Sequence, residues 1–348
     1  MAKKKTRLPL LAAILAVAAG LAVANPALSQ DAGLPVLKLA LADGAINPTP
    51  DSVLELAEKL GFYEKHGVKV ELVELQGTPQ AVAALNTGAV DLADITIDSA
   101  IRLRADSDLP IRGIVASGIG SPFLVAAKAE IKTPADLAGK AFAIANRGSL
   151  DQNLTQSWLQ GIGMSPDAPD WVPIGPPATR VQALAAGRVD ATTVSFGTFL
   201  SIKGTPGIHV LVTPEDFGKT GPQLSKFVAA LDGTIDKKHE AIQHFTDALI
   251  DAARSFAANP DQWVKAMGDV RDDLAKENLE ATARFFDRYW CVNGCMNRDM
   301  LAKTAAYIYA SKDFADVKKV DLGDFTDLSF VANSLRTEGA AQGSIDPP

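Results

Sequence analysis

Cysteine and histidine are scarce in this sequence: its 348 residues include two cysteines, Cys291 and Cys295, and four scattered histidines. A structural zinc site takes four closely spaced Cys or His ligands, which these residues do not supply, so we expect no metal. The two cysteines flank Val292-Asn293-Gly294. Around such a turn they could close a small disulfide loop in an oxidising compartment, or they could stay as two reduced thiols.

Motifs of nucleotide binding and hydrolysis are missing as well. The sequence has no complete phosphate-loop motif, no His-Glu-x-x-His and no Gly-x-Ser-x-Gly. Gly118-Ile119-Gly120 begins like a dinucleotide loop, but Phe123 stands where the third glycine belongs and Pro122 blocks the helix that should follow. We therefore predict a protein that uses no cofactor and is not an enzyme.

Positive charge is in deficit, with 34 Lys and Arg against 41 Asp and Glu and a net charge of −7. An acidic chain is a poor nucleic-acid binder, so we expect no nucleic-acid partner. Long apolar runs are missing beyond the N-terminal segment, which argues against internal membrane spans.

The N-terminal segment has the pattern of a secretory signal peptide. Met1–Arg7 carries four basic and no acidic residues, and the apolar run from Leu8 to Ala24 is too short for a good membrane span. Small residues favour cleavage after Ser29, with Ala24 as the alternative. We predict a signal peptide over residues 1–29 and an exported, soluble mature chain.

Short apolar runs alternate with helical periodicity, which predicts an α/β fold with largely parallel strands. The pattern occurs twice. Ala84-Leu85-Asn86-Thr87-Gly88-Ala89-Val90-Asp91 matches Ala183-Leu184-Ala185-Ala186-Gly187-Arg188-Val189-Asp190. In both, Ala-Leu closes a helix, Gly permits a left-handed turn and Val-Asp opens a strand. Helix-Gly-strand joints recur in many α/β proteins, but two copies in equivalent places favour two lobes.

After about residue 222 the chain becomes mainly helical, with one more strand at Lys226–Leu231. A strand that returns late, followed by helices, fits a chain that leaves one lobe, builds the other and comes back. We predict lobe 1 from residues 30–121 and 223–348, lobe 2 from residues 122–222, and two crossover segments near residues 121–123 and 223–226.

Helix N-termini that follow strands are candidate anion sites, because free N–H groups and the helix dipole favour negative charge there. Three such places are Gly77-Thr78-Pro79, Asn146-Arg147-Gly148-Ser149 and Thr179-Arg180. Arg147 is the strongest candidate, since a guanidinium can hold a carboxylate by two bonds. Each hydroxyl in these places could instead be an ordinary helix cap.

Ligands of open α/β sheets sit beyond the carboxyl ends of the strands, which extends this candidate set. Phe123 and Phe196 could stack on an apolar part of the solute, or they could pack in the core. The candidate ligand-binding residues are Asp43, Asn47, Thr78, Asp98, Ser99, Ser117, Phe123, Asn146, Arg147, Gly148, Ser149, Arg180, Ser195 and Phe196.

The segment Leu56–Glu71 resembles ABC-transporter solute-binding proteins of the nitrate/sulfonate/taurine type, in the thiamine-precursor-binding-like superfamily. In that family a helix ends in Glu-x-x-Gly-Phe-Phe/Tyr, and a turn leads to a hydrophobic-x-hydrophobic-Glu strand, as here. Residues 84–91 and 187–190 are similar too. The run Pro134-x-Asp136-Leu137-x-Gly139-Lys140 is the most specific part. The resemblance covers roughly residues 36–230.

The resemblance implies a periplasmic binding protein fold of the second type: two α/β lobes, two crossovers and a helical C-terminal region. It also implies a periplasmic, monomeric protein that closes on a small solute and delivers it to a permease with its ATPase. Many relatives have an aromatic residue where this chain has Asp43–Asn47. We expect a small organic anion, a carboxylate before a sulfonate or nitrate. A neutral pyrimidine- or flavin-type ligand, a thiamine-pathway enzyme and a ligand sensor are the alternatives.

Overall fold

A computed structural model describes residues 33–42, 46–75, 77–107, 109–120, 122–220, 224–342 and 346. The predicted signal peptide and Asp43 lie outside the described residues. None of the helices in the described ranges is both long and apolar enough to cross a membrane.

Five of the apolar runs form a first sheet, in the order β2-β1-β3-β10-β4. Strand β1 pairs in parallel with β2 and β3, whereas β10 is antiparallel to both β3 and β4. The strands are β1 (Val36–Leu41), β2 (Lys69–Glu74), β3 (Leu92–Thr96), β4 (Ile111–Val115) and β10 (Lys226–Leu231). The late strand therefore lies inside the first sheet and not at its edge.

A second sheet repeats this plan in the order β7-β6-β8-β5-β9. Here β6 is parallel to β7 and β8, and β5 is antiparallel to β8 and β9. The strands are β5 (Phe123–Lys128), β6 (Ala141–Ile144), β7 (Asp170–Pro173), β8 (Ala191–Ser195) and β9 (Ile208–Val212). The α/β fold with two similar sheets, predicted from the sequence, is confirmed.

We use "first lobe" for the first sheet and the helices around it, and "second lobe" for the second sheet and its helices. The chain passes from the first sheet to the second after β4 and returns before β10. An isolated bridge between Ile119 and Leu224 joins these two passages. The residue boundaries of the lobes stay a prediction.

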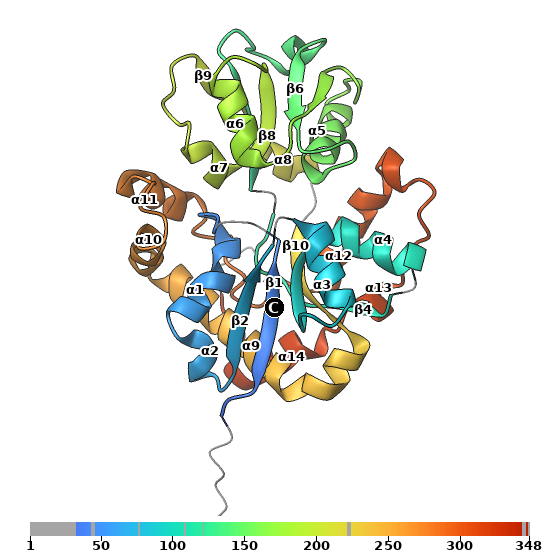
Figure 1. Ribbon diagram of the computed structural model, residues 1–348, viewed down its shortest axis with the longest axis vertical. Helices are drawn as coiled ribbons and strands as arrows, with labels where there is room; N and C mark the ends of the chain where they lie inside the picture. The colour runs from blue at the N-terminus through green and yellow to red at the C-terminus, as the bar shows by residue number, and fades with distance from the viewer. Residues whose placement is uncertain are drawn as a thin grey trace, which may run out of the picture. The chain divides into compact units, whose positions relative to one another are not determined.

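Helices lie on both sides of each sheet (Figure 1). In the first lobe they are α1 (Val53–Lys59), α2 (Phe62–Lys65), α3 (Thr78–Asn86), α4 (Ile97–Ser107), α9 (Asp232–Ala258), α10 (Pro260–Gly268), α11 (Lys276–Phe285), α12 (Arg298–Tyr309), α13 (Leu322–Phe325) and α14 (Ser329–Glu338). In the second lobe they are α5 (Leu150–Gly161), α6 (Pro177–Ala185), α7 (Phe196–Leu200) and α8 (Pro214–Thr220). Short 3₁₀ turns are η1 (Pro50–Ser52), η2 (Pro134–Leu137) and η3 (Lys312–Phe314).

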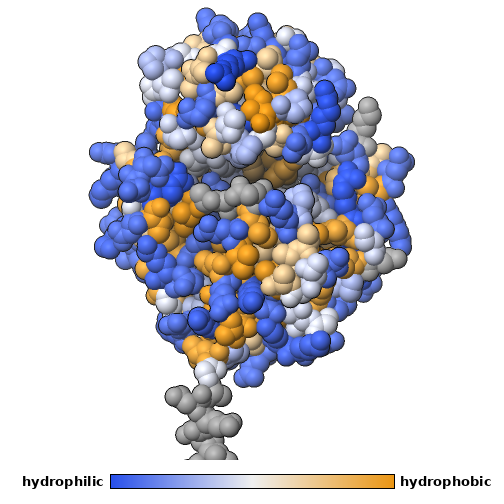
Figure 2. Space-filling view, viewed as in Figure 1, coloured by the Kyte–Doolittle hydropathy of each residue, from blue (hydrophilic) through white to orange (hydrophobic). Residues whose placement is uncertain are grey.

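Alternating side chains of the central strands supply the apolar cores. Along β5, Val125 and Ala127 belong to one buried cluster of the second lobe, and Leu124 and Ala126 belong to another. Successive side chains of a strand point to opposite faces, so both faces of this sheet are covered. On the face shown in Figure 2, apolar residues lie in patches among hydrophilic ones and do not form one continuous band.

The repeated Val-Asp pair closes the same joint in both lobes. In the first lobe the Asp91 carboxylate accepts a hydrogen bond from the Lys38 backbone N–H at 2.9 Å. In the second lobe Asp190 accepts one from the Ala141 N–H at 3.0 Å. Each aspartate therefore ties the residue before one strand to the neighbouring parallel strand, β3 to β1 in the first lobe and β8 to β6 in the second. We call each of these contacts a strand clamp, and the repeat is a structural element.

Cys291 and Cys295 form a disulfide. The loop between them holds the C-terminal segment and the end of β4. Asn293 and Cys295 donate their backbone N–H groups to the buried Asp346 carboxylate, at 2.6 and 3.2 Å. The Gly294 carbonyl accepts from the Ala116 N–H at 3.2 Å. Gly294 has a φ of 80°, and a Cβ there would lie 2.8 Å from Val331, so only glycine fits.

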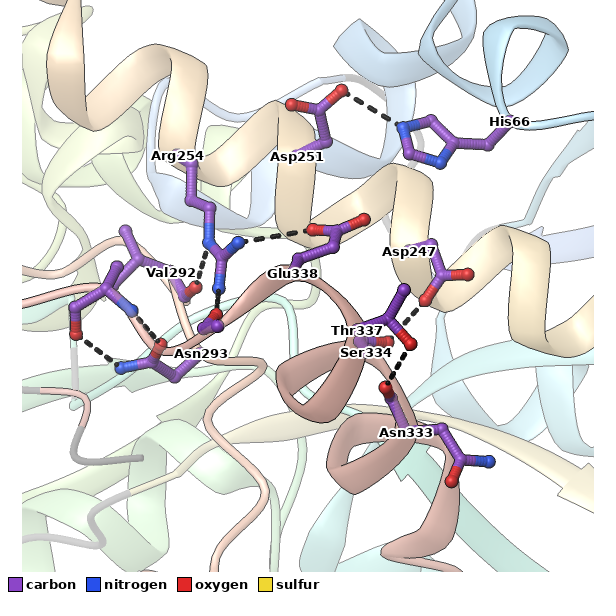
Figure 3. Close-up of polar contacts among 12 residues, drawn as sticks. His66, Asp247, Asp251, Arg254, Val292, Asn293, Asn333, Ser334, Thr337 and Glu338 are labelled. Carbon is purple, nitrogen blue, oxygen red and sulfur yellow. Dashed lines mark hydrogen bonds and ion pairs between the residues drawn. The ribbon is translucent and has the colours of Figure 1, made fainter.

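Polar side chains of α9 connect α2, the disulfide loop and α14 (Figure 3). Arg254 donates to the Val292 carbonyl at 2.8 Å and lies 3.2 Å from the Glu338 carboxylate. One turn earlier, Asp251 lies 3.0 Å from His66. This network fixes the helical C-terminal region against the first sheet.

Candidate functional site

The residues that follow β3 and β4 lie at the carboxyl edge of the first sheet. Ser117 is 1% exposed, and its hydroxyl donates to the Asp51 and Asp94 carboxylates at 3.3 and 3.5 Å. Asp94 in turn forms a buried ion pair with Lys226 at 3.3 Å. Ser99 is occupied locally, because its hydroxyl accepts from Thr96 at 2.9 Å. Ser117 and Ser99 therefore support the first lobe itself.

The loop before α5 folds as the sequence predicts, but most of its polar groups bond within the loop. Ser149 is the N-cap residue, and its hydroxyl donates to the Asn146 carbonyl at 2.6 Å. The Gly148 N–H is taken by the Gln152 side chain at 2.7 Å. Arg147 is exposed, which makes its guanidinium the available group of this loop.

Arg180 differs from the expectation that it meets solute. Its side chain is 2% exposed, and its guanidinium donates to the Gly175 and Thr193 carbonyls at 2.7 and 3.1 Å. Burial lowers the pKa of Arg180, and the nearby Asp151 opposes that shift. The sequence shows a basic residue in the first turn of a helix, but not that neighbouring strands enclose it. We place Arg180 as a residue that stabilises the second lobe.

Thr78, which we predicted as a helix cap, occupies the first position of α3, and Gly77 is the N-cap with a φ of 146°. The side chain of Thr78 is half-buried, as is that of Asn47, whose carbonyl accepts the Thr49 N–H at 2.8 Å. Neither has a contact that assigns it a role in binding.

Ser195 and the two phenylalanines are engaged in packing and capping. The Ser195 hydroxyl accepts from the Thr198 N–H at 3.2 Å and caps α7. Phe196 stacks on Phe285 with ring centroids 5.3 Å apart, so α7 of the second lobe meets the end of α11 of the first. Phe123 packs against the second-lobe core. The stacking role foreseen for Phe196 is thus filled by another residue of the chain.

A pocket lies between helices of the two lobes; its cavity volume is about 30 Å³, and it opens to solvent. Leu150, Asn153, Leu154 and Ser157 of α5 form its second-lobe wall. The first-lobe wall consists of Asp98, Leu224, Ser225, Tyr307, Ile308, Ser311 and Phe314. Asp98 is the candidate residue from the sequence that lines this pocket, and Leu150 directly follows the candidate loop 146–149.

The pocket contains buried polar atoms that no described residue satisfies. Oδ1 of Asp98 and Oγ of Ser311 are both buried and have no hydrogen-bond partner among the described residues. Burial raises the pKa of Tyr307 to about 12, a hydrogen bond with Ser157 opposes the shift, and the Asp98 charge adds to it. Tyr307 also packs against apolar residues of both lobes.

The sequence analysis did not identify five polar residues that line the pocket: Asn153, Ser157, Ser225, Tyr307 and Ser311. Tyr307 lies on a predicted helix, but periodicity gives no indication that α12 reaches the second lobe. Ser157 lies two turns into α5, away from the helix starts where free N–H groups indicate an anion site. One usable signal was present, because Asp98 follows a buried strand and the edge rule selected it. The described residues contain no group of three or more His, Cys, Asp or Glu that could hold a metal ion.

Two lobes of the same sheet order, joined by two passages and with a pocket between them, define the class of two-lobed solute-binding proteins. The profile of the family described as "NMT1/THI5 like" matches residues 52–263. The chain belongs to this family.

Individual proteins agree with that assignment. A putative binding protein of Brucella abortus (strain 2308) is 30% identical over 237 residues, which are 67% of this chain and 71% of the relative. The taurine-binding periplasmic protein of Escherichia coli K12 is 28% identical over 206 residues, 59% of this chain and 62% of that protein. The structure of a putative periplasmic sulfonate-binding protein of an ABC transporter from Methylobacillus flagellatus KT has a TM-score of 0.66 at 18% identity. The match covers 90% of this chain and 99% of that protein, so the chain has the periplasmic binding protein fold.

Proposed function

We propose that this protein is the extracytoplasmic solute-binding component of an ABC importer, which binds a small solute between its lobes and delivers it to a permease with its ATPase. The pocket lined by both lobes carries this proposal, because a solute held there contacts both and favours their closure. The family and the periplasmic relatives support it. Binding is followed by release of the unchanged solute.

The proposal also covers the cellular compartment, the processing and the oligomeric state of the protein. The chain is periplasmic, its signal peptide is cleaved after about Ser29, and the mature protein is a monomer. The mass of the exported protein tests the cleavage site, and size-exclusion chromatography with light scattering tests the monomer. A mature mass that still includes residues 1–29 contradicts this part of the proposal.

For the solute we propose a small organic anion, a carboxylate before a sulfonate or nitrate. Arg147 supports this choice because it is exposed, and Leu150, three residues later, lines the pocket. A guanidinium binds a carboxylate through two charge-assisted hydrogen bonds, which makes it the natural contact for such a group.

A thermal-shift screen of carboxylates, sulfonates, nitrate and neutral pyrimidines, followed by calorimetry, tests the solute class. Arg147→Ala should weaken carboxylate binding by more than about tenfold, since a hydrogen bond to a charged group contributes about 1.5–3 kcal/mol. Arg188→Ala, which removes an exposed arginine at the turn after α6, is the matched control. Stabilisation by pyrimidines and by no anion contradicts the anion class. Recovery of a chemically altered solute would instead indicate an enzyme.

A further inference from the structure

We propose that the pocket between α4, α5 and α12 receives an ammonium group carried on an apolar part of the solute, with Asp98 as its counter-ion. This inference rests on the proposed solute-binding function, but not on the solute being an anion. It assigns Asp98, Ser311 and Tyr307 as specificity-determining residues of the second end of the solute.

The charge of the pocket is the first argument. Among the described residues that line it, Asp98 is the one carboxylate, and none is Lys, Arg or His. The nearest arginine on the same helix, Arg102, is occupied elsewhere: it stacks over the Phe314 ring at 4.3 Å and donates to the Asp313 carbonyl at 2.7 Å. Oδ1 of the half-buried Asp98 has no partner among the described residues, and an unpaired carboxylate oxygen in such surroundings favours a cation from outside.

The buried polar atoms are the second argument. Asp98 Oδ1 and Ser311 Oγ have no hydrogen-bond partner among the described residues, although burying such atoms unpaired costs about 1–3 kcal/mol each. An ammonium group has three N–H donors and is a suitable partner for such oxygens. Ordered water can also donate to these atoms, but it leaves the carboxylate charge uncompensated.

The walls are the third argument. Leu150, Leu154, Leu224 and Ile308 are aliphatic, and Phe314 adds an aromatic ring, so the polar atoms belong to a mainly apolar lining. Such a lining suits the last carbon atoms of a hydrocarbon chain that ends in an amine. Because Leu150 lies close in sequence to Arg147, a molecule with a carboxylate at its other end can engage both groups.

The test uses four probes of equal chain length: 6-aminohexanoate, 6-hydroxyhexanoate, hexanoate and hexylamine, each titrated into the mature protein by calorimetry. We expect 6-aminohexanoate to bind most tightly. Asp98→Asn should weaken its binding by more than about tenfold, and it should leave hexanoate unchanged. Asp106→Asn, an exposed aspartate near the end of the same helix, is the control and should change neither.

Folding does not obscure this test, because Asp98→Asn keeps the shape of the side chain and removes a buried charge. Its melting temperature should equal or exceed that of the original protein. Tyr307→Phe should weaken the binding of 6-aminohexanoate by a smaller factor, about three to ten.

The outcomes separate the two proposals. If hexanoate and 6-aminohexanoate bind equally and Asp98→Asn changes neither, the ammonium site is wrong while the anion proposal stands. If 6-hydroxyhexanoate binds as tightly as 6-aminohexanoate, a hydroxyl and not an ammonium occupies the pocket, and the inference is overturned. If hexylamine binds, with loss in Asp98→Asn, while hexanoate does not, the ammonium site stands and the anion class is wrong.

Discussion

The two lobes share a sheet order and a strand clamp, yet they differ in the charged side chains at the carboxyl edges of their sheets. The edge of the first sheet carries carboxylates, with Asp94 buried beside Lys226 and Asp98 at the pocket. The loop of the second lobe at the corresponding edge carries the exposed Arg147. One α/β unit used twice thus carries a carboxylate at the pocket in one lobe and an exposed guanidinium in the other, and our proposal assigns these two groups to unlike ends of the solute.

The lobes also differ in what covers their sheets. The second lobe has short helices and one buried ion pair, Arg180 with Asp151 at 3.8 Å. The first lobe has the long α9, the disulfide loop and the buried Asp346. Variants in equivalent places should therefore reveal which properties belong to the common plan and which belong to one lobe.

The largest change in the free energy of unfolding is expected from loss of the buried ion pairs. Arg180→Leu in the second lobe and Lys226→Leu in the first each leave a buried carboxylate without its cation. Each should lower the free energy of unfolding by about 3–5 kcal/mol in urea denaturation. The exposed Arg188→Leu should change it by less than about 0.5 kcal/mol. An unchanged midpoint for Arg180→Leu would mean that this arginine does not hold the second lobe together.

A pH effect on stability should come next, from the buried Asp346 of the first lobe. Burial raises the pKa of Asp346 from 3.8 to about 6. The folded protein then holds this proton more tightly than the unfolded chain, so stability from this group is complete below pH 3.8 and is lost as the pH rises through 6. We expect a loss of about 3 kcal/mol across that window. Asp346→Asn should remove this slope, and the exposed Asp316→Asn should keep it. A slope identical in both variants contradicts the assignment.

The smallest effect should come from the strand clamps, which test the common plan directly. Asp91→Ala and Asp190→Ala each remove one carboxylate bond to a backbone N–H and should each cost about 1–2 kcal/mol at pH 7. The bond from Lys128 holds the pKa of Asp190 below 3.8. The difference between Asp190→Ala and the original protein should therefore persist at pH 4 and shrink as the pH falls below 3.8. Markedly unequal effects at pH 7 would show that the two joints are not equivalent.

Much of the fold was predictable from the sequence because strands, helices and joints are recorded locally. The apolar run Lys226–Leu231 gave the bounds of β10, and the twin Ala-Leu-x-x-Gly-x-Val-Asp segments gave the equivalent joints. Less was predictable where the boundary depends on packing. The helix α11 ends at Phe285, where Phe285 and Tyr289 pack against Phe286, and Phe286 contacts Phe196 of the second lobe.

The site was less predictable because the pocket combines residues distant in the chain. Asp98 follows the strand-edge rule, but Tyr307 reaches the pocket only because α12 returns to the first lobe after the second is complete. Polar residues near helix starts were candidates for solute contact, but several of them bond within the protein. Ser195 caps α7 with its hydroxyl, whereas Ser149 occupies the N-cap position of α5 with its hydroxyl bonded to the Asn146 carbonyl, and Arg180 donates to carbonyls inside the second lobe.

The position of β10 between β3 and β4 has a consequence for the order in which the chain folds. Within the first sheet β4 pairs with β10 alone, and β10 begins at Lys226. The second sheet uses one continuous stretch, Phe123–Val212, so its contacts close shorter loops. Because long-range pairing is slower, the second lobe should form first, as a finished insert within a lobe that is still missing a central strand. Until β10 pairs, β3 and β4 lack their shared neighbour, so this is the stage at which the first lobe is most exposed to misfolding.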